Sequence, residues 1–393
     1  MQKIFSSLCL TCQYGAQHVL KEEISRDYPD LRFSYSRGAF STWLFDPEHF
    51  KPLENETMKS HRFQIPENRK INKTSRLIDT VFGRSCILSM GKIKSSDMAD
   101  STPMTTAFWR QVVDAIDSVP DSSWFSAGIH RIHVWQPDAE EPGKHRYEPG
   151  LTPLAQEIQR KIVQDCPDHI KQRLAPNDPN AWQAIEGYLG ETCLDCIVVA
   201  PNEWWIGTHR VVDEHSRWPG GLLPLQLPSD AVSRAWLKFE EGLRWSEFPI
   251  GQGGHCVDIG SAPGGGSQAL LARDAFVVGV DPAEMAPSVL AHPNFVHARG
   301  KISQLKRKLF RKSRWLLTDM NVAPLYTLDA LEELACRDDL SIQGMLFTLK
   351  LFDWKLAAEI PDYIQRIRTW GFSQIKVRQL QFNRQEVMVA ASR

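Results

Sequence analysis

The sequence predicts an α/β protein: a C-terminal Rossmann-like sheet preceded by a smaller N-terminal α+β region. A glycine-rich turn joins two short apolar segments within 256–281. Further apolar segments at 315–319 and 345–350 each end in a charged residue. Short continuous apolar segments are typical of strands in a buried parallel sheet. Before residue 216, strand-like and helix-like patterns alternate, as in small α+β domains.

The first half is predicted to contain a ferredoxin-like piece followed by a second α/β module. Residues 53–75 are polar and poor in apolar side chains, which favours a linker. Two apolar segments separated by Pro201-Asn202-Glu203 predict a β-hairpin. The expected strands are 4–12, 31–35, 76–90, 129–135, 194–200 and 204–210, and the expected helices are 16–28, 106–116 and 153–165.

The length of 393 residues exceeds one typical hydrophobic core and predicts two or three domains. We expect an N-terminal ferredoxin-like region at 1–75, a second module at 76–215 and the Rossmann-like domain at 216–393. No apolar segment approaches the length of a membrane span, and no signal-like segment opens the chain. We therefore expect a cytoplasmic protein without a membrane partner, and the sequence indicates no oligomeric state.

The turn after the first apolar segment is the most informative part of the chain. It reads Gly260-Ser-Ala-Pro-Gly264-Gly265, without the G-x-G-x-x-G spacing by which dinucleotide folds hold a pyrophosphate. A ligand without phosphate needs no such cradle. Asp281 is expected to accept hydrogen bonds from ribose hydroxyls, and Asp258 to position a cationic or amine group. S-adenosylmethionine has these features and is the expected cofactor.

Two further apolar segments end in Asp319 and Lys350. On parallel strands both residues would lie at the same sheet edge as Asp258 and Asp281, where open α/β sheets carry their chemistry. A buried lysine beside a buried aspartate and a methyl donor predicts a site for proton abstraction, because desolvation and nearby cations favour the neutral amine. Each residue alone could simply end its strand in solvent, but the ordered set favours a site.

Four motifs and the turn resemble those of the RlmM type of bacterial 23S rRNA cytidine 2′-O-ribose methyltransferases, a branch of the FtsJ-like Rossmann methyltransferases. The motifs are SRAWLKFEEG, WLLTDMNVAP, FTLKLF and FNRQEVMV, with DIGSAPGG at the turn, and they occur in family order. The resemblance is strong from about residue 225 onward. It implies a catalytic tetrad of Lys238, Asp319, Lys350 and Glu386, and an S-adenosylmethionine site made of Asp258, Gly260, Ser261, Ala262, Pro263, Gly264, Gly265, Asp281 and Asp319.

The resemblance implies direct methyl transfer to a ribose 2′-hydroxyl of 23S rRNA. Lys350 would accept the ribose proton, Asp319 would position Lys350 and the hydroxyl, and Lys238 would stabilise the developing alkoxide. Glu386 would orient Lys238 or the ribose. Residues 76–215 are similar to the family's THUMP-like RNA-binding region, and a structural domain that only buttresses the catalytic one stays an alternative. Two other functions stay open, namely 2′-O-methylation of tRNA or an mRNA cap, and an inactive RNA-binding relative.

Two positions depart from the family pattern. Gly266 stands where the family usually has a tryptophan after the paired glycines. The acid expected after the third strand is missing from the segment HARGKISQ, which carries Lys301 and Ser303 instead. Adenine recognition is therefore expected to use backbone groups or another side chain.

The net charge of −1 does not indicate a nucleic-acid partner, but one segment does. Residues 301–314 (KISQLKRKLFRKSR) are half Lys and Arg, with no acid. Such a segment either contacts RNA phosphates or forms a solvated face. We expect it to adjoin the active edge, and both interpretations stay open.

The eight cysteines include two C-x-x-C pairs, Cys9/Cys12 and Cys193/Cys196, which together could form a zinc site. Both pairs lie in strand-like segments, where residues three apart face opposite sides, so one pair cannot chelate an ion by itself. We therefore expect buried thiols and no metal. His133, on another expected strand, is expected to have a structural role.

Overall fold

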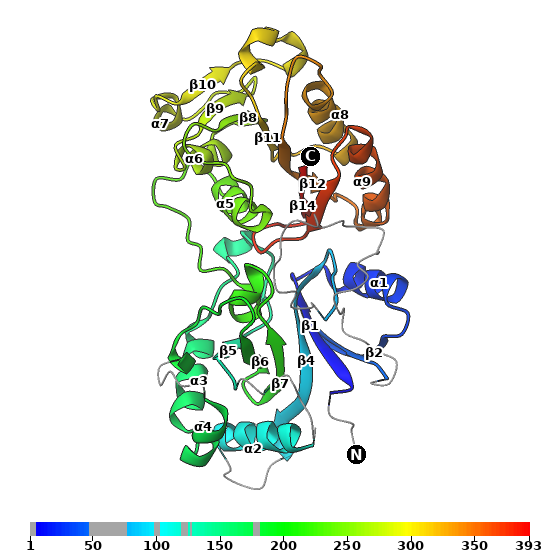
Figure 1. Cartoon of the computed structure of the whole chain (residues 1–393), viewed down its shortest axis with the longest axis vertical. Coiled ribbons are helices and arrows are strands. Elements are labelled where there is room, and N and C mark those ends of the chain that lie inside the picture. The colour runs from blue at the N-terminus through cyan, green and yellow to red at the C-terminus, as the bar shows by residue number, and fades with distance from the viewer. Residues whose placement is uncertain (1–4, 47–76, 98–102, 119–124, 126–127, 176–180) are drawn as a thin grey trace. The chain divides into compact units, whose positions relative to one another are not determined.

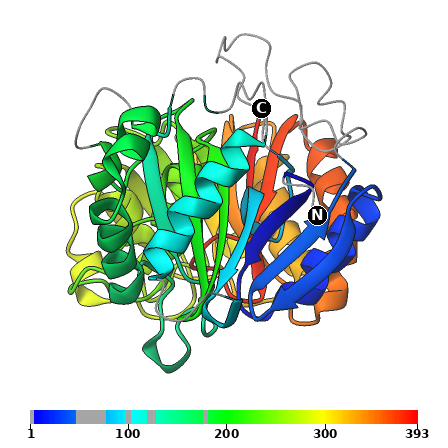
Figure 2. The same cartoon turned by 90° about the horizontal axis from the view of Figure 1, so that it is seen from below.

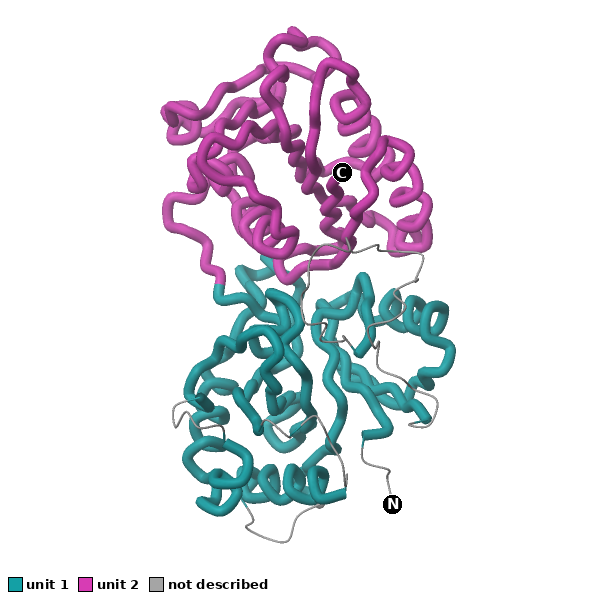
Figure 3. Tube along the Cα trace, in the orientation of Figure 1, with its two compact units in different colours: residues 1–58, 67–224 teal, residues 59–66, 225–393 magenta. Residues whose placement is uncertain are grey.

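The computed structural model describes residues 5–46, 77–97, 103–118, 125, 128–175 and 181–393 (Figure 1). These residues form two compact units, and among them the first unit ends at Pro224 and the second begins at Leu225 (Figure 3). The linker expected at 53–75 lies outside the described residues. No helix in the described part of the chain combines the length and apolar character that a membrane span requires.

The first unit contains a seven-stranded sheet in the order β2-β3-β1-β4-β7-β6-β5. All neighbours pair antiparallel except β5 and β6, which are parallel. The β1–β4 pair joins strands of the expected 1–75 and 76–215 regions in one sheet, and β6 and β7 confirm the expected hairpin. The strands are β1 Ser7–Cys12, β2 Arg32–Arg37, β3 Phe40–Leu44, β4 Gly83–Lys94, β5 Arg131–Trp135, β6 Thr192–Ala200 and β7 Glu203–Arg210.

Helices of the first unit cover this sheet with apolar faces. Phe108 and Val112 of α2 and Ile158 of α3 pack in one buried cluster with alternate residues of β6, such as Leu194. Figure 2 shows α2, in cyan, lying across the strands. Thr152 caps α3, because its Oγ1 accepts a hydrogen bond from the Ala155 N–H at 3.1 Å. The helices are α1 Gln17–Asp27, α2 Met104–Asp117, α3 Pro153–Gln164 and α4 Asp168–Leu174.

The second unit contains a seven-stranded sheet in the order β10-β9-β8-β11-β12-β14-β13. The first five strands are parallel, and β14 runs antiparallel to β12 and β13. The strands are β8 His255–Ile259, β9 Phe276–Val280, β10 Phe295–Ala298, β11 Trp315–Thr318, β12 Gly344–Lys350, β13 Gln374–Arg378 and β14 Glu386–Ser392, and the helices are α5 Ala235–Ser246, α6 Gly265–Leu271, α7 Pro287–Leu290, α8 Pro324–Ala335 and α9 Ile360–Thr369.

This topology confirms the expected α/β class and places the site. Every residue of β11 and β12 is buried, which is why both read as continuous apolar segments. From β8 the chain continues to β9 and β10 on one side of the sheet, then returns to β11 and β12 on the other. Ligands of open α/β sheets bind outside the carboxyl ends of the strands at such a reversal. The crevice between the ends of β8 and β11 is therefore the expected binding position.

Candidate active site

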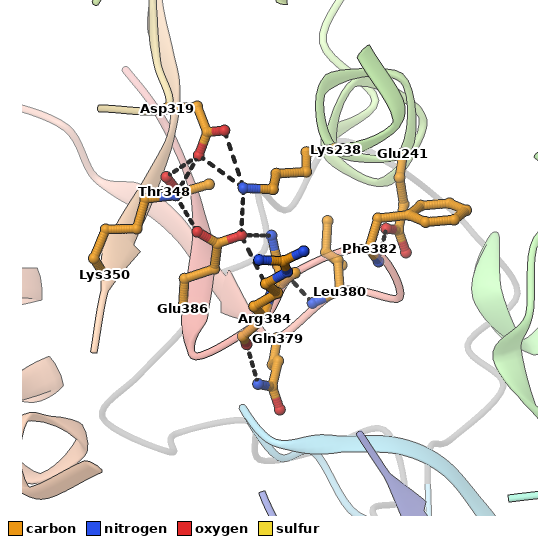
Figure 4. A network of polar contacts seen from close by, with 11 residues as sticks. Lys238, Glu241, Asp319, Thr348, Lys350, Gln379, Leu380, Phe382, Arg384 and Glu386 are labelled. Atoms are coloured by element: carbon orange, nitrogen blue, oxygen red, sulfur yellow. Dashed lines mark hydrogen bonds and ion pairs between the residues drawn. The ribbon is translucent and has the colours of Figure 1, made fainter. Parts of the chain in front are cut away.

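The four residues of the expected tetrad come together at the carboxyl edge of the second unit's sheet (Figure 4). Asp319 follows β11, Lys350 ends β12, and Glu386 begins the antiparallel strand β14 opposite Lys350. Lys238 reaches the same point from α5. Four segments far apart in the sequence thus converge because parallel strands end at a common edge and an antiparallel strand starts there.

The tetrad is a closed ring of ion pairs. Lys350 Nζ lies 2.6 Å from Asp319 Oδ1 and also contacts Glu386 Oε2. Lys238 Nζ lies 3.0 Å from Asp319 Oδ2 and 2.7 Å from Glu386 Oε1. Each ammonium therefore contacts both carboxylates, and the two charges of each sign balance. Such charge-assisted hydrogen bonds hold all four side chains in one geometry.

Burial makes this balance necessary. The side chain of Glu386 is only 3% exposed, and those of Lys238 and Lys350 are 11% and 9% exposed. Burial acts to raise the pKa of Glu386, but the charges of Lys238 and Lys350 outweigh it and lower that pKa to about 2. Burial acts to lower the pKa of Lys238, but Glu386 and Asp319 outweigh it and raise that pKa. Glu386 and Lys238 are therefore both charged at neutral pH.

Two supporting residues were missed from the sequence. Thr348 donates from Oγ1 to Asp319 Oδ1 at 2.6 Å and fixes that carboxylate. Glu241, which is fully buried, accepts the backbone N–H groups of Gln381 at 2.8 Å and Phe382 at 3.1 Å (Figure 4). It thereby ties α5 to the loop that precedes Glu386. The sequence carries no signal for Thr348, because threonine is common in strands. Glu241 could have been found, because it lies three residues after Lys238 and therefore on the same helix face.

The glycine-rich turn lies beside the tetrad, at the end of β8. Gly260 has φ +70°, and a Cβ there would overlap Met320, so the position requires glycine. Asp281, which follows β9, accepts the Ala262 N–H at 3.0 Å through Oδ2 and the Ala283 N–H at 2.8 Å through Oδ1. Its carboxylate therefore anchors the turn, and each oxygen keeps a lone pair for a ligand.

Asp258 is placed differently from Asp281. It is 2% exposed, and its Oδ2 accepts a hydrogen bond from Ser267 Oγ at 2.7 Å. Burial above all raises its pKa to about 7, and the charges of Asp319 and Asp281 add to the rise. The carboxyl group braces β8 against α6, and a role in holding a ligand amine stays a prediction.

Comparison with known proteins identifies the family. A family model described as FtsJ-like methyltransferase matches residues 231–386. Ribosomal RNA large subunit methyltransferase M of Haemophilus influenzae (strain PittEE) is 33% identical over 336 residues, which cover 81% of this chain and 79% of that protein. The chain belongs to the ribosomal RNA large subunit methyltransferase M family. The expected family resemblance is thereby confirmed.

Other methyltransferase M relatives match over a shorter region. Those of Halorhodospira halophila (strain DSM 244 / SL1) and Laribacter hongkongensis (strain HLHK9) are 30% and 33% identical over 45% of this chain. The matches span about half the length of these relatives, 51% and 52%. Among solved structures, a Methanococcus jannaschii fibrillarin pre-rRNA processing protein aligns at 13% identity, covering 49% of this chain and 80% of that chain with a TM-score of 0.32. The family assignment comes from the sequence relatives.

The structure explains one departure from the pattern expected for the methyltransferase M family. A Cβ on Gly266 would lie 2.8 Å from the ring of Phe239 and 3.3 Å from Asp258 Oδ2. Phe239 of α5 therefore takes up the space beside α6, and a tryptophan at 266 would not fit. Within the third strand, β10, His297 Nε2 lies 3.0 Å from the Asp281 backbone oxygen, and after that strand Lys301 is exposed.

The carboxyl-terminal end of the basic segment does not lie at the active edge, which the whole segment was expected to adjoin. Arg314 donates its N–H to the oxygen of His255, the first residue of β8, at 2.9 Å. Arg311 and Lys312 come just before it, so this end of the segment lies at the amino-terminal edge of the sheet. The expectation was wrong for this end of the segment because the chain crosses the whole sheet between the end of β10 and the start of β11.

In the first unit, the structure brings His133, Cys193 and His209 together with Asp195. Both nitrogens of His209 face acceptors, Asp195 Oδ2 at 2.6 Å and the Ser216 oxygen at 2.9 Å. The ring therefore carries two protons, and the ion pair with Asp195 overcomes burial and raises its pKa. A doubly protonated imidazole has no lone pair for a metal, so this arrangement is a buried polar brace. Cys193 and Cys196 lie on opposite faces of β6, as expected.

Proposed function

We propose that this protein is an S-adenosylmethionine-dependent RNA 2′-O-ribose methyltransferase that acts on large-subunit rRNA, and specifically on 23S rRNA, in the cytoplasm. The observation that carries the proposal is the closed ring of Lys238, Asp319, Lys350 and Glu386 beside the glycine-rich turn. The names of the methyltransferase M relatives support an rRNA substrate. The FtsJ-like match over 231–386 contains all four residues.

The residues at the turn fit S-adenosylmethionine. They offer backbone groups and the carboxylate of Asp281, with no basic residue in 258–265 to hold a phosphate. Asp281 would accept ribose hydroxyls, and Gly260, Ser261, Ala262, Pro263, Gly264 and Gly265 would let the ligand approach the backbone closely. When bound, S-adenosylmethionine supplies an electrophilic methyl group.

The tetrad would activate the ribose 2′-hydroxyl. Once its own ammonium proton has passed to solvent, Lys350 would accept the proton that leaves the 2′-hydroxyl, and the hydroxyl oxygen would thereby become the nucleophile. Asp319 and Glu386 contact Lys350 Nζ and would stabilise the ammonium that forms. Lys238 places a fixed positive charge beside the developing alkoxide, and Asp319, held by Thr348, orients both lysines.

Mapping of 2′-O-methyl marks in total RNA tests this function. A deletion strain should lose one mark in 23S rRNA, and the wild-type gene should restore it. The Lys350→Ala gene should not, although its product should bind S-adenosylmethionine in calorimetry. If the deletion strain instead loses a mark in tRNA or mRNA, that RNA is the substrate and rRNA is not. If the deletion strain keeps all 2′-O-methyl marks although the protein binds S-adenosylmethionine, the protein is an RNA-binding relative without this activity.

A further inference from the structure

The basic segment lines a cleft on the side of the second unit opposite the tetrad. The cleft has a volume of about 530 Å³ and lies between the loop before β8 and the segment before β11. Gly251, Gly253, His255, Arg311, Lys312 and Arg314 are among its lining residues. The Arg314 oxygen also accepts the Gln343 N–H at 2.7 Å, so the floor of the cleft is fixed by the first residues of the strands.

The charges of this cleft are all of one sign. Arg311, Lys312 and Arg314 line it, and none of its lining residues is acidic. Within the described ranges, none of these three side chains has a carboxylate partner within ion-pair distance. Burial, and then the charges of Lys312 and Arg314, lower the pKa of His255. The cleft therefore holds three uncompensated cations and a neutral imidazole.

The loop before β8 that lines the cleft is rich in glycine. A Cβ on Gly251 or Gly253 would meet no atom within 4 Å, so space is open beside both residues. Arginine and lysine side chains that line a cleft together with an open glycine loop are suited to a phosphate, which accepts several hydrogen bonds at once. A free phosphate ion and the phosphate of an RNA backbone share this chemistry.

We propose that this cleft binds the phosphate backbone of the RNA substrate at a distance from the target nucleotide, an inference that rests on the proposed function. Gly344 begins β12 beside Trp315, which lines the cleft, whereas Lys350 ends β12 in the tetrad. Seven residues of strand separate the two ends by about 20 Å. An RNA that occupies both positions therefore extends beyond one nucleotide.

A binding experiment with two matched variants tests the proposal. Arg311→Gln with Lys312→Gln removes two charges from the cleft, and Lys306→Gln with Lys308→Gln removes two exposed charges of the same segment outside it. Affinity is measured as a function of salt for in-vitro-transcribed 23S rRNA and for a 12-nucleotide single-stranded RNA. Circular dichroism confirms that both variants fold.

The cleft variant should lose at least about tenfold in affinity for the 23S transcript, and the slope of log affinity against log salt should fall by roughly 1.4–1.8, the contribution of two phosphate contacts. The slope for the 12-nucleotide RNA should fall as well, because its backbone carries the same phosphates, and the affinity for S-adenosylmethionine should equal that of the wild type. The control variant should keep the wild-type slope. Equal slopes in the wild type and the cleft variant, or an equal loss in the control variant, overturn the proposal.

Inorganic phosphate alone distinguishes the two sources of the ligand. Calorimetric binding of phosphate that is lost in the cleft variant, without any change in the RNA slope, would assign the cleft to a free anion and overturn the RNA proposal. Methyl transfer is measured separately. If the wild-type protein methylates the RNA but the salt slopes of the variants are unchanged, the proposed function stands and the proposed role of the cleft is wrong. If the slope of the cleft variant changes but the wild-type protein does not methylate the RNA, the cleft binds RNA and the proposed function is wrong.

Discussion

Lys350 and Glu386 are cross-strand partners in the antiparallel β12–β14 pair, and their side chains form a buried ion pair. Strand register thus places the ammonium and the carboxylate at the same point without any contribution from loops. Register in a sheet with buried faces is strongly specified, because a slip by one residue would turn every side chain to the other face. The register of the sheet therefore fixes the relative position of Lys350 and Glu386.

Lys350→Ala should reduce methyl transfer roughly a hundredfold or more, because a positioned proton acceptor is lost. Lys350→Arg should fail as well, since a guanidinium stays protonated at any useful pH. Single-turnover methylation of the RNA substrate measures both effects. Calorimetry with S-adenosylmethionine is the control and should give wild-type affinity. If the Arg variant keeps most of its activity, Lys350 supplies only positive charge, and the proton goes elsewhere.

Asp281→Ala should weaken S-adenosylmethionine binding by about 1–3 kcal/mol, because hydrogen-bond partners on the ligand and at Ala262 lose their acceptor. Titration calorimetry measures the change. Glu284→Ala is a matched control, since Glu284 is a nearby acid with an 85% exposed side chain. Equal affinities for the wild type and the Asp281 variant would remove Asp281 from the cofactor site.

Gly266→Ala should destabilise the protein by about 1–3 kcal/mol, because the added methyl group would press on Phe239 and Asp258. Urea unfolding of the full chain gives the free energy. Gly251→Ala is the control, since a Cβ there meets no atom within 4 Å. That variant should match or slightly exceed the wild type in stability. A loss of stability at 251 equal to that at 266 would contradict the assigned packing.

The contribution of Asp258 to the free energy of unfolding should fall as pH rises from about 4 to about 7. Its pKa is 3.8 ordinarily and about 7 in the folded protein, so in this interval the unfolded chain loses a proton that the folded chain keeps. The slope is at most about 1.4 kcal/mol per pH unit, and it ends above about pH 7. Asp258→Asn should remove this contribution in urea unfolding at both ends of the interval. A variant with the wild-type pH dependence would show that Asp258 is ionised throughout.

The sequence predicts the second unit better than the first. Buried parallel strands such as β11 and β12 can be recognised in the sequence as continuous apolar segments, and the charged residues at their ends indicate the active edge. Partners such as Thr348 carry no local signal, because their importance comes from contacts across the sheet. The joining of β1 and β4 depends on pairing between distant segments, which periodicity does not report. The division of the first unit at residue 75 and its THUMP-like character stay predictions.

Because of the buried hydrogen bonds of Glu241, helix α5 positions two parts of the tetrad. The same helix face presents Lys238 to the ring and clamps the backbone of Gln381 and Phe382, which leads into Glu386. The positions of Lys238 and Glu386 therefore depend on each other, and the segments that carry them cannot be replaced separately. In a chimera between relatives, α5 and the loop before β14 would have to be transplanted as one piece, and a graft of either alone would separate the charges that they align.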